Sequence, residues 1–556
     1  MENNQVIWII LKKLRIPFLV LLVTFSVSIL GMMLIPGVDD KGHIYHLNFF
    51  DAFYFVSYMA TTIGFGESPY PFTYPQKLWV TVAIYLTVIG WFYAIGTIVA
   101  LIQDDALKKA IAVNKFRKQV LGLVEDFYII LGYNRITKDI INYASQNNIR
   151  FVVIDKNELK IEELILEDFY PFVPSTVGDA TNQYILKLAG INQKNCKGVI
   201  SLFEDDAKNM QIATICKLLN PDIDLIVKAT SKHQVDYFKS LGIRYIQNPF
   251  DIIAKRIYLN LISPYIWLLE LWAYGHNLKL EQKDLLPKGK YIICGYGRMG
   301  LALEKGLKKA GVEYEVYPIY PKEYLEKKGG VIFGDDEDKE NLIKVGIKDA
   351  VAVFAATNND LLNLTILNTA KKLNPKIYTI ARENSLEDLT IFQAANFDRI
   401  YVLETILAEY TNTIISREMV DIFIKEIRKM ENEWGEIIVN MLINIAGVNP
   451  IYYEVEINEE NAYALSLYLK KIKITLGDIR KSRENREELL KMVYLLLKRE
   501  DEYTLMPSPD TEIKTGDKLL IGGSYEVIED FEYIINNIYE LEYVLNLDKG
   551  VKNANN

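Results

Sequence analysis

Two long apolar segments near the beginning of the chain constrain its fold more than any other feature. Residues 16–35 and 78–102 contain no charged side chain. As helices rising about 1.5 Å per residue, both are long enough to cross a bilayer core of about 30 Å. A soluble protein can bury one such helix in its core. Two of them among the first 102 of 556 residues indicate a membrane protein with two spans.

The charges that flank these segments predict the orientation of the chain. Basic residues cluster before the first segment and after the second, whereas the loop between them has two lysines and four carboxylates. Cytoplasmic flanks are rich in Lys and Arg. We therefore expect a protein of the cell membrane, surrounded by the lipid bilayer, with both termini in the cytoplasm. The flanking basic residues are Lys12, Lys13, Arg15, Lys108, Lys109, Lys115, Arg117 and Lys118.

Composition limits what the rest of the chain can be. Hydrophobic residues make up 50% of the sequence, so most of the chain resembles soluble protein, and its length predicts three to five folding units. A net charge of −9 argues against nucleic acid as a partner. The three cysteines form no CxxC pair, and His43 and His46 lie in the loop between the spans. We expect no bound metal from these residues.

The loop between the two spans contains a short helix followed by a glycine-bearing segment. Residues 51–60 are apolar and aromatic, with Asp51 near the start, which predicts a buried helix with an acidic first turn. The next residues are Thr61-Thr62-Ile63-Gly64-Phe65-Gly66-Glu67.

This segment has the residue types that coordination of a dehydrated potassium ion requires. Backbone carbonyl oxygens replace the water of the ion only if they all point to one axis. Successive carbonyls do so when the chain alternates between left- and right-handed dihedral angles, which Gly64 and Gly66 permit. We expect the Thr62 hydroxyl to add a ligand, and Ile63 and Phe65 to face the preceding helix.

The segment resembles the potassium-channel signature TVGYG followed by Asp. The match runs from Thr62 to Glu67, with Phe65 in place of Tyr and Glu67 in place of Asp. The missing Tyr hydroxyl affects the rigidity of the filter more than the identity of the ion. The resemblance implies a selectivity filter at residues 61–66 that conducts K⁺. One copy cannot encircle an ion, so we expect each chain to assemble with three identical subunits.

Two glycines lie within the second apolar segment. Gly90 and Gly96 lower the local stability of a helix and permit a bend, which predicts a gating hinge. The alternative is close packing between membrane helices. By resemblance to two-span channels, Gly90 is the favoured hinge.

The cytosolic remainder contains one α/β pattern twice. After a charged helical stretch at 104–124, residues 127–131 form an apolar run typical of a buried parallel strand, followed by a turn beginning at Gly132 and a second strand ending at Asp155. The order recurs from residue 290. The matching markers are Gly178-Asp179 with Gly334-Asp335, and Leu219-Asn-Pro221 with Leu373-Asn-Pro375. This pattern indicates an internal duplication of a Rossmann-type unit.

Both copies have a candidate nucleotide site at the turn after the first strand. Such a turn lets a phosphate approach the N–H groups of a helix N-terminus. The first turn is Gly132-Tyr133-Asn134-Arg135-Ile136-Thr137, with Asn134 and Thr137 where glycines are expected, but with Asp155 for a ribose. The second is Gly295-Tyr296-Gly297-Arg298-Met299-Gly300, without a terminal acid in the strand at 313–320. Whether each copy holds a nucleotide or is purely structural stays open.

These markers resemble the RCK domain, which regulates conductance of potassium and is of TrkA-N and TrkA-C type. The resemblance implies a membrane α-helical pore domain plus α/β, with two Rossmann-like RCK domains and small α+β C-terminal lobes. It also adds Thr357 and Asn358 as ligand-facing residues. Lys228 and Thr230 stand where the family has the two carboxylates of a calcium site. The expected division is a pore domain at 1–103, a linker at 104–124, RCK domains at 125–285 and 286–450, and a C-terminal lobe with tail at 451–556.

The resemblance as a whole implies a prokaryotic two-transmembrane-helix potassium channel rather than an enzyme. Four chains would form a ring of eight RCK domains, and NAD or an adenine nucleotide is the expected regulatory ligand. One alternative is a membrane-tethered NAD(P)-dependent oxidoreductase, for which the sequence offers no catalytic His or Lys cluster. Another is a ring-forming regulatory subunit of a separate transporter, a class that lacks a pore loop.

Overall fold

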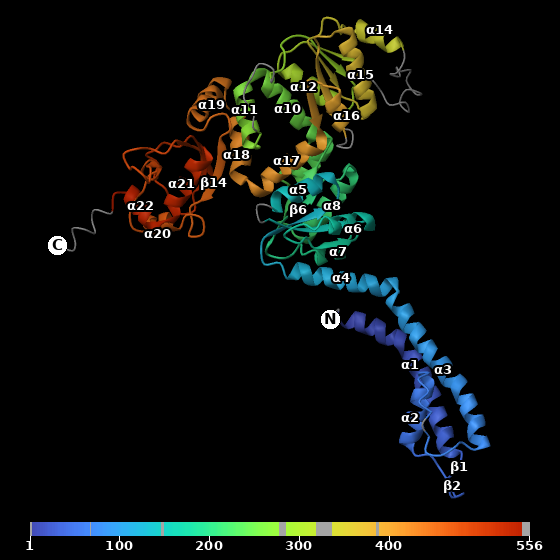
Figure 1. Cartoon of the computed structure of the whole chain (residues 1–556). Helices are drawn as coiled ribbons and strands as arrows, with labels where there is room; N and C mark the ends of the chain where they lie inside the picture. Colours follow the sequence, from blue (N-terminus) through green and yellow to red (C-terminus); the bar gives the residue numbers. More distant parts are fainter. Residues whose placement is uncertain are drawn as a thin grey trace, which may run out of the picture. The chain divides into compact units, whose positions relative to one another are not determined.

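The computed structural model describes residues 3–66, 68–145, 149–276, 285–317, 336–384 and 389–547. The chain divides into two compact units, Met1–Leu123 and Val124–Asn556 (Figure 1). Three residues named above, Glu67, Gly334 and Asp335, lie outside the described residues.

The first unit is a helical bundle with two helices of membrane-spanning length, at Ile10–Leu34 and Tyr74–Ile102. Their apolar side chains are largely exposed: Phe18 is 69% and Leu78 is 68% accessible. Such helices are stable in lipid but not in water, which gives the unit its membrane location. Its elements are α1 (Asn3–Leu34), β1 (Gly37–Val38), β2 (Ile44–Tyr45), α2 (Phe49–Ala60), α3 (Tyr74–Ile102) and α4 (Asp105–Leu121).

The second unit begins with a parallel six-stranded sheet in the order β5-β4-β3-β6-β7-β8. Its inner strands are short and largely buried on both faces, because helices cover both sides. The strands are β3 (Phe127–Leu131), β4 (Arg150–Asp155), β5 (Ser175–Val177), β6 (Cys196–Ser201), β7 (Asp224–Lys228) and β8 (Tyr245–Gln247). The helices are α5 (Arg135–Ser145), α6 (Glu158–Leu166), α7 (Gln183–Leu188), α8 (Asp206–Leu219) and α9 (Lys232–Ser240).

The second parallel sheet repeats this topology with strand order β10-β9-β11-β12-β13. In both sheets the first strand lies in the interior and the chain reverses direction beside it, as in doubly wound folds. The duplication expected from the sequence is therefore present as two Rossmann-like sheets. The strands are β9 (Tyr291–Cys294), β10 (Tyr314–Tyr317), β11 (Ala352–Ala355), β12 (Tyr378–Glu383) and β13 (Arg399–Val402), and the helices are α12 (Arg298–Lys309), α14 (Asp336–Lys344), α15 (Asp360–Leu373) and α16 (Leu389–Ala394).

The two Rossmann-like halves exchange a helix. Helix α10 (Pro249–Ile262) follows the first sheet but packs on α12 of the second, where Gly306 lets the helices approach closely. Helix α17 (Leu403–Ser416) follows the second sheet but packs on α5 of the first. Phe250 and Ile253 thus belong to the core of the second half, and Leu407 to the core of the first. Neither half can complete its core without the other.

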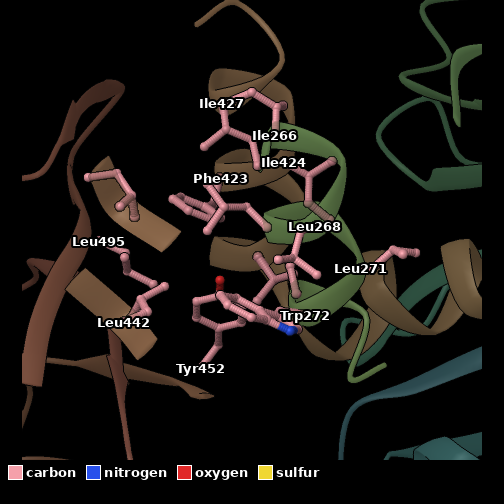
Figure 2. Close-up of a cluster of buried hydrophobic side chains, with 14 of the residues drawn as sticks. Ile266, Leu268, Leu271, Trp272, Phe423, Ile424, Ile427, Leu442, Tyr452 and Leu495 are labelled. Atoms are coloured by element: carbon pink, nitrogen blue, oxygen red, sulfur yellow. The ribbon is translucent and has the colours of Figure 1, made fainter. Parts of the chain in front are cut away.

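A third core joins helices to the C-terminal lobe (Figure 2). Trp272 and Phe423 pack there against Leu442, Tyr452 and Leu495. The sheet of this lobe is antiparallel, in the order β14-β17-β15-β16, so the expected α+β lobe is present. The elements are α11 (Pro264–Ala273), α18 (Glu418–Ile427), α19 (Asn432–Ala446), β14 (Ile451–Glu456), α20 (Tyr463–Leu469), β15 (Met492–Arg499), β16 (Glu502–Leu505), β17 (Lys518–Gly523), α21 (Tyr525–Asn536) and α22 (Ile538–Val544).

Buried charged side chains form a network between two helical hairpins. One hairpin is α10 with α11, and the other is α17 with α18. Glu270, 1% exposed, accepts two hydrogen bonds from Arg428 at 2.9 and 2.8 Å. Arg256 donates to Glu409 at 2.9 Å, and Nε2 of His276 lies 3.2 Å from the other oxygen of Glu409. Burial acts to raise the pKa of Glu409, but the bond with His276 and the charge of Arg256 hold it below its ordinary value. Because these residues come from hairpins that follow different sheets, the network ties the two halves together.

Candidate functional site

The short helix of the membrane unit has a well-defined beginning. The side chain of Asn48 accepts a hydrogen bond from the backbone N–H of Asp51 at 2.9 Å, and its amide donates to the Asp51 carboxylate at 2.8 Å. An amide cap and an acidic residue in the first turn both favour a helix N-terminus. These contacts fix where α2 starts and hence where its C-terminal end delivers the glycine-bearing segment.

Backbone conformation alternates along that segment. Thr62, Gly64 and Gly66 have φ of 63°, 64° and 76°, while Ile63 and Phe65 between them do not have positive φ. The N–H groups of Ile63 and Gly64 both donate to the carbonyl of Tyr58, at 3.0 and 3.3 Å. Sequence reasoning assigned positive φ to the two glycines alone. The structure adds Thr62, a β-branched residue for which this conformation costs about 1–2 kcal/mol.

Phe65 contacts the helix that precedes it. Its ring lies 6.3 Å from the ring of Tyr58 with an interplanar angle of 74°, an edge-to-face contact. In the single chain Ile63 is nevertheless 60% exposed, and Phe65 is 66% exposed. The hydroxyl of Thr61 turns back to the helix and donates to the Ser57 carbonyl at 2.9 Å.

The two glycines of α3 have different surroundings. A Cβ added at Gly90 would lie 2.7 Å from Thr24 Oγ1 of α1, whereas one added at Gly96 would meet no described residue within 4 Å. Gly90 is thus the residue that lets α1 and α3 approach, as small residues do between membrane helices. A hinge at either position stays a prediction.

We expect Gly90→Ala to destabilise the helix pair by about 1–3 kcal/mol, because the methyl group overpacks against Thr24. Thr24→Ala removes the atoms nearest to the added methyl group. Combined with Gly90→Ala, it should restore the thermal midpoint of the full-length protein in detergent. Gly96→Ala is the matched control and should not lower it. A Thr24→Ala/Gly90→Ala protein as unstable as Gly90→Ala alone would contradict the packing role.

The first glycine-rich turn satisfies its own hydrogen-bond donors. Tyr133 N–H donates to the Asp155 carboxylate at 2.6 Å. Asn134 N–H donates to the Thr137 hydroxyl at 2.8 Å, and Thr137 N–H to the Asn134 side chain at 3.0 Å. The carboxylate expected to hold a ribose is therefore bound to the turn, and the two non-glycine residues cap the helix that a phosphate would approach. Arg135 points along α5, with Nε 3.7 Å from Asp139.

An aromatic ring also covers the first turn. Gly132, with φ of 89°, would place a Cβ 2.7 Å from the ring of Phe203, and Lys208 Nζ lies 3.6 Å from the centre of that ring. At the neighbouring strand end, Gly178 N–H donates to the Asp155 carbonyl, and Asp179 is held by the hydroxyl and N–H of Thr181. These bonds to Thr181 keep the pKa of Asp179 below its ordinary value.

The second turn leaves the N-terminus of its helix uncovered, whereas the ring of Phe203 covers the first turn. Gly297 precedes α12, and a Cβ there would meet no described residue within 4 Å. Among the described residues, the N–H groups of Arg298 and Met299 at the start of α12 have no hydrogen-bond acceptor, and the same holds for Arg135 and Ile136 at the start of α5. A Cβ at Gly300 would lie 2.1 Å from the Gly295 carbonyl oxygen, so only glycine permits this turn to close. The result is an exposed helix N-terminus, a geometry that suits a phosphate.

Thr357 occupies the place in the second half that Phe203 occupies in the first. A Cβ at Gly295 would lie 2.9 Å from Thr357 Cγ2. Asn363 holds Thr357, accepting from its N–H at 3.0 Å and from its hydroxyl at 2.7 Å. In the first half, Asn209 plays the same part and accepts from Phe203 N–H at 3.2 Å. Sequence analysis missed Phe203; its position within the repeat, aligned with Thr357, was the available signal. Tyr296 points away from the turn to Glu304, and Asn358 is exposed.

Two arginines lie beside this open turn. The guanidinium groups of Arg298 and Arg382 lie 5.3 and 5.2 Å from the ring centre of Phe250. Burial and the charge of Arg298 lower the pKa of Arg382 to about 10. Arg298 also donates to the Thr230 hydroxyl of the first half at 2.5 Å and lies 3.8 Å from Asp206. Two guanidinium groups thus lie at this turn, with the carboxylates of Asp360 and Glu204 also acting on Arg382. Arg382 was not among the residues that the sequence indicated.

Comparison with known proteins agrees with this architecture. Residues 128–249 and 291–403 match the TrkA-N domain family. The chain thus combines two membrane-length helices with two segments that match the TrkA-N domain family. It is 29% identical to potassium channel protein 1 of Methanocaldococcus jannaschii over 282 residues, 51% of this chain and 78% of that protein. It is 28% identical to probable potassium channel protein 2 of the same organism over 333 residues, 56% of this chain and 91% of that protein.

Among solved structures, the chain is similar to the GsuK channel bound to NAD, with a TM-score of 0.44, 16% identity, and coverage of 96% of this chain and 99% of that one. The predicted resemblance to potassium channels with RCK-type domains is thereby confirmed by the family match and the named relatives.

Proposed function

We propose that this chain is the subunit of a homotetrameric, potassium-selective channel with both termini in the cytoplasm. The observation that carries the proposal is the alternation of positive φ at Thr62, Gly64 and Gly66, at the end of a capped helix between two spans. Alternation turns successive carbonyl oxygens toward one side, where they replace the water of a potassium ion. The pore domain corresponds to residues 1–103 and the linker to 104–124.

Assembly around a four-fold axis follows from the same loop. One loop supplies ligands on one side of an ion only, and its outward side chains, Ile63 and Phe65, are mostly uncovered in the single chain. Four copies would both surround the ion and cover these side chains. With two RCK domains per chain, at 125–285 and 286–450, the tetramer carries eight of them.

The regulatory ligand in this proposal is NAD or an adenine nucleotide bound to the second half. The open N-terminus of α12, together with Arg298 and Arg382, offers N–H donors and positive charge to a phosphate. In the first half Asp155 accepts from Tyr133 N–H, and Asn134 and Thr137 bond each other's N–H groups. The ring of Phe203 also lies against that turn. We therefore assign the first half a structural role and the second the ligand.

Ligand binding would reach the pore through the contact between the halves. Arg298 joins the open turn to Thr230 of the first half. A phosphate at α12 competes for this guanidinium, and drawing it away weakens the tie between the halves. Since α10 and α17 are exchanged between the halves, a change in the angle between the halves displaces both helices. Through the linker, the same change would displace the end of the pore helix α3. The relatives are named potassium channels, which favours this reading over a membrane-tethered oxidoreductase.

Two measurements test the channel and its ligand separately. Liposomes containing the purified chain should pass K⁺ but exclude Na⁺; equal passage of both ions would overturn the channel assignment. Flux with and without NAD, ADP or ATP then tests gating, and a flux indifferent to all three would overturn the ligand assignment while leaving the channel intact.

Nucleotide affinity should depend on the second turn and not on the first. Gly297→Val places a side chain in open space, so the turn folds but its phosphate position is filled; we expect at least a tenfold loss of affinity by calorimetry. Arg298→Gln removes a charged hydrogen bond worth about 1.5–3 kcal/mol, about tenfold or more. Arg135→Gln, the matched change in the first turn, should leave affinity within about twofold. Equal losses for the two arginine variants would contradict a site confined to the second half, and a loss confined to Arg135→Gln would place the ligand in the first.

A further inference from the structure

The cytoplasmic ends of the membrane helices carry a concentrated positive charge that the proposed function does not use. Residues 3–15 and 104–121 contain eight basic side chains and two carboxylates, in a chain whose net charge is −9. The basic residues belong to the beginning of α1 and to α4. Lys12, Arg15, Lys108, Lys115 and Lys118 are all exposed.

Helix α4 starts against α1. The chain turns after α3, and α4 runs at a wide angle to it (Figure 1). Asp104 caps α4 by accepting from Leu107 N–H at 3.0 Å, and the same carboxylate pairs with Lys13 of α1. The Lys13 ammonium holds the pKa of Asp104 below its ordinary value. One of the two carboxylates in this region is therefore neutralised by the contact that positions the helix.

The face of α4 that touches α1 continues as a basic stripe. Lys108, Ile111, Lys115 and Lys118 follow Asp104 by four, seven, eleven and fourteen residues, the spacing of one helix face. The Lys13–Asp104 contact lies on this face, close in sequence to the uncharged part of α1 that begins at Ile16. The exposed Ile111, 50% accessible, lies among the three lysines. A stripe of lysines with an apolar residue, beside the end of a membrane span, suits the boundary between headgroups and acyl chains.

We propose that the α4 stripe, with Lys12 and Arg15 of α1, is a binding site for the headgroups of anionic phospholipids. Lysine stems extend along apolar surface while the ammonium groups reach the phosphate layer. Basic clusters directly beside a membrane span attract anionic lipid, each charge strengthening binding about fivefold. The lipid would hold α4, which connects the end of α3 to the cytosolic unit, at the membrane surface.

Native mass spectrometry of the full-length protein tests the site directly. Titration with phosphatidylglycerol and, separately, phosphatidylcholine gives the preference for the anionic lipid. We expect the wild type to prefer phosphatidylglycerol, and Lys108→Gln/Lys115→Gln/Lys118→Gln to lose at least tenfold of that preference, with about a hundredfold as the upper limit. Raising the salt concentration should weaken the preference of the wild type in the same way.

A matched variant separates a local site from net charge. Lys348→Gln/Lys372→Gln/Lys376→Gln removes three exposed lysines from the second Rossmann-like half and should keep the wild-type preference. An equal loss in this control, or no preference in the wild type, would overturn the proposal. The proposal would also be overturned if the triple α4 variant bound both lipids as the wild type does but no longer formed the wild-type oligomer. The stripe would then contact protein. If the triple variant does not fold, the three single variants, at about fivefold each, give the same test.

Discussion

Gly64→Ala is expected to abolish potassium flux. Gly64 has a φ of 64°, a conformation that costs an L-residue about 1–2 kcal/mol. In the proposed tetramer the cost is repeated in each subunit, about 4–8 kcal/mol in total. At 1.4 kcal/mol per tenfold, the population of the conducting filter falls about a thousandfold or more. The measurement is K⁺ uptake into liposomes containing equal amounts of assembled protein.

Gly42→Ala is the control for that experiment. Gly42 has a φ of 84°, and a Cβ there, as at Gly64, meets nothing within 4 Å, so the two substitutions impose similar backbone strain without a clash. Gly42 lies in the turn between β1 and β2, outside the proposed filter. Its variant should retain selective K⁺ flux. If Gly64→Ala conducts as well as Gly42→Ala, the segment is not an ion-coordinating strand.

Glu270→Gln should destabilise the cytosolic unit by about 3–5 kcal/mol. Glu270 is buried, receives two hydrogen bonds from Arg428 and lies 3.9 Å from Arg256. Removing its charge leaves the guanidinium group of Arg428 without its carboxylate partner, which costs more than the pair itself contributes. Thermal unfolding of the full-length protein, followed by the signal of the cytosolic unit, should show a midpoint lower by several degrees.

Two further variants distinguish a buried charge effect from general damage. Glu270→Leu/Arg428→Leu removes both partners and should recover most of the stability, because apolar residues replace a buried ion pair at little cost. Glu459→Gln breaks an exposed pair with Lys470 and should not shift the midpoint measurably. A Glu270→Gln protein as stable as Glu459→Gln would show that water reaches the network.

Local patterns were sufficient for several features of the fold. The lengths of the apolar runs predicted two membrane helices, and recurring Gly-Asp and Asn-Pro markers predicted two Rossmann-like halves. The glycine spacing at Gly64 and Gly66 predicted an alternating backbone, but the sequence did not indicate that Thr62 shares it. Thr62 takes that conformation at the beginning of the filter segment, just after α2, where the carbonyl of Tyr58 accepts from the N–H groups of Ile63 and Gly64.

By itself the sequence determined the membrane spans, the glycine-bearing segment and the duplication, because each depends on residues close together in the chain or on a repeated order of them. Only the tertiary structure decided which glycine-rich turn is open, that Gly90 contacts Thr24, and that α10 and α17 are exchanged between the halves. Phe203 covers Gly132, and Arg298 reaches Thr230, across long separations in sequence. Such contacts depend on where packing brings distant side chains, and no local pattern of residues encodes that position.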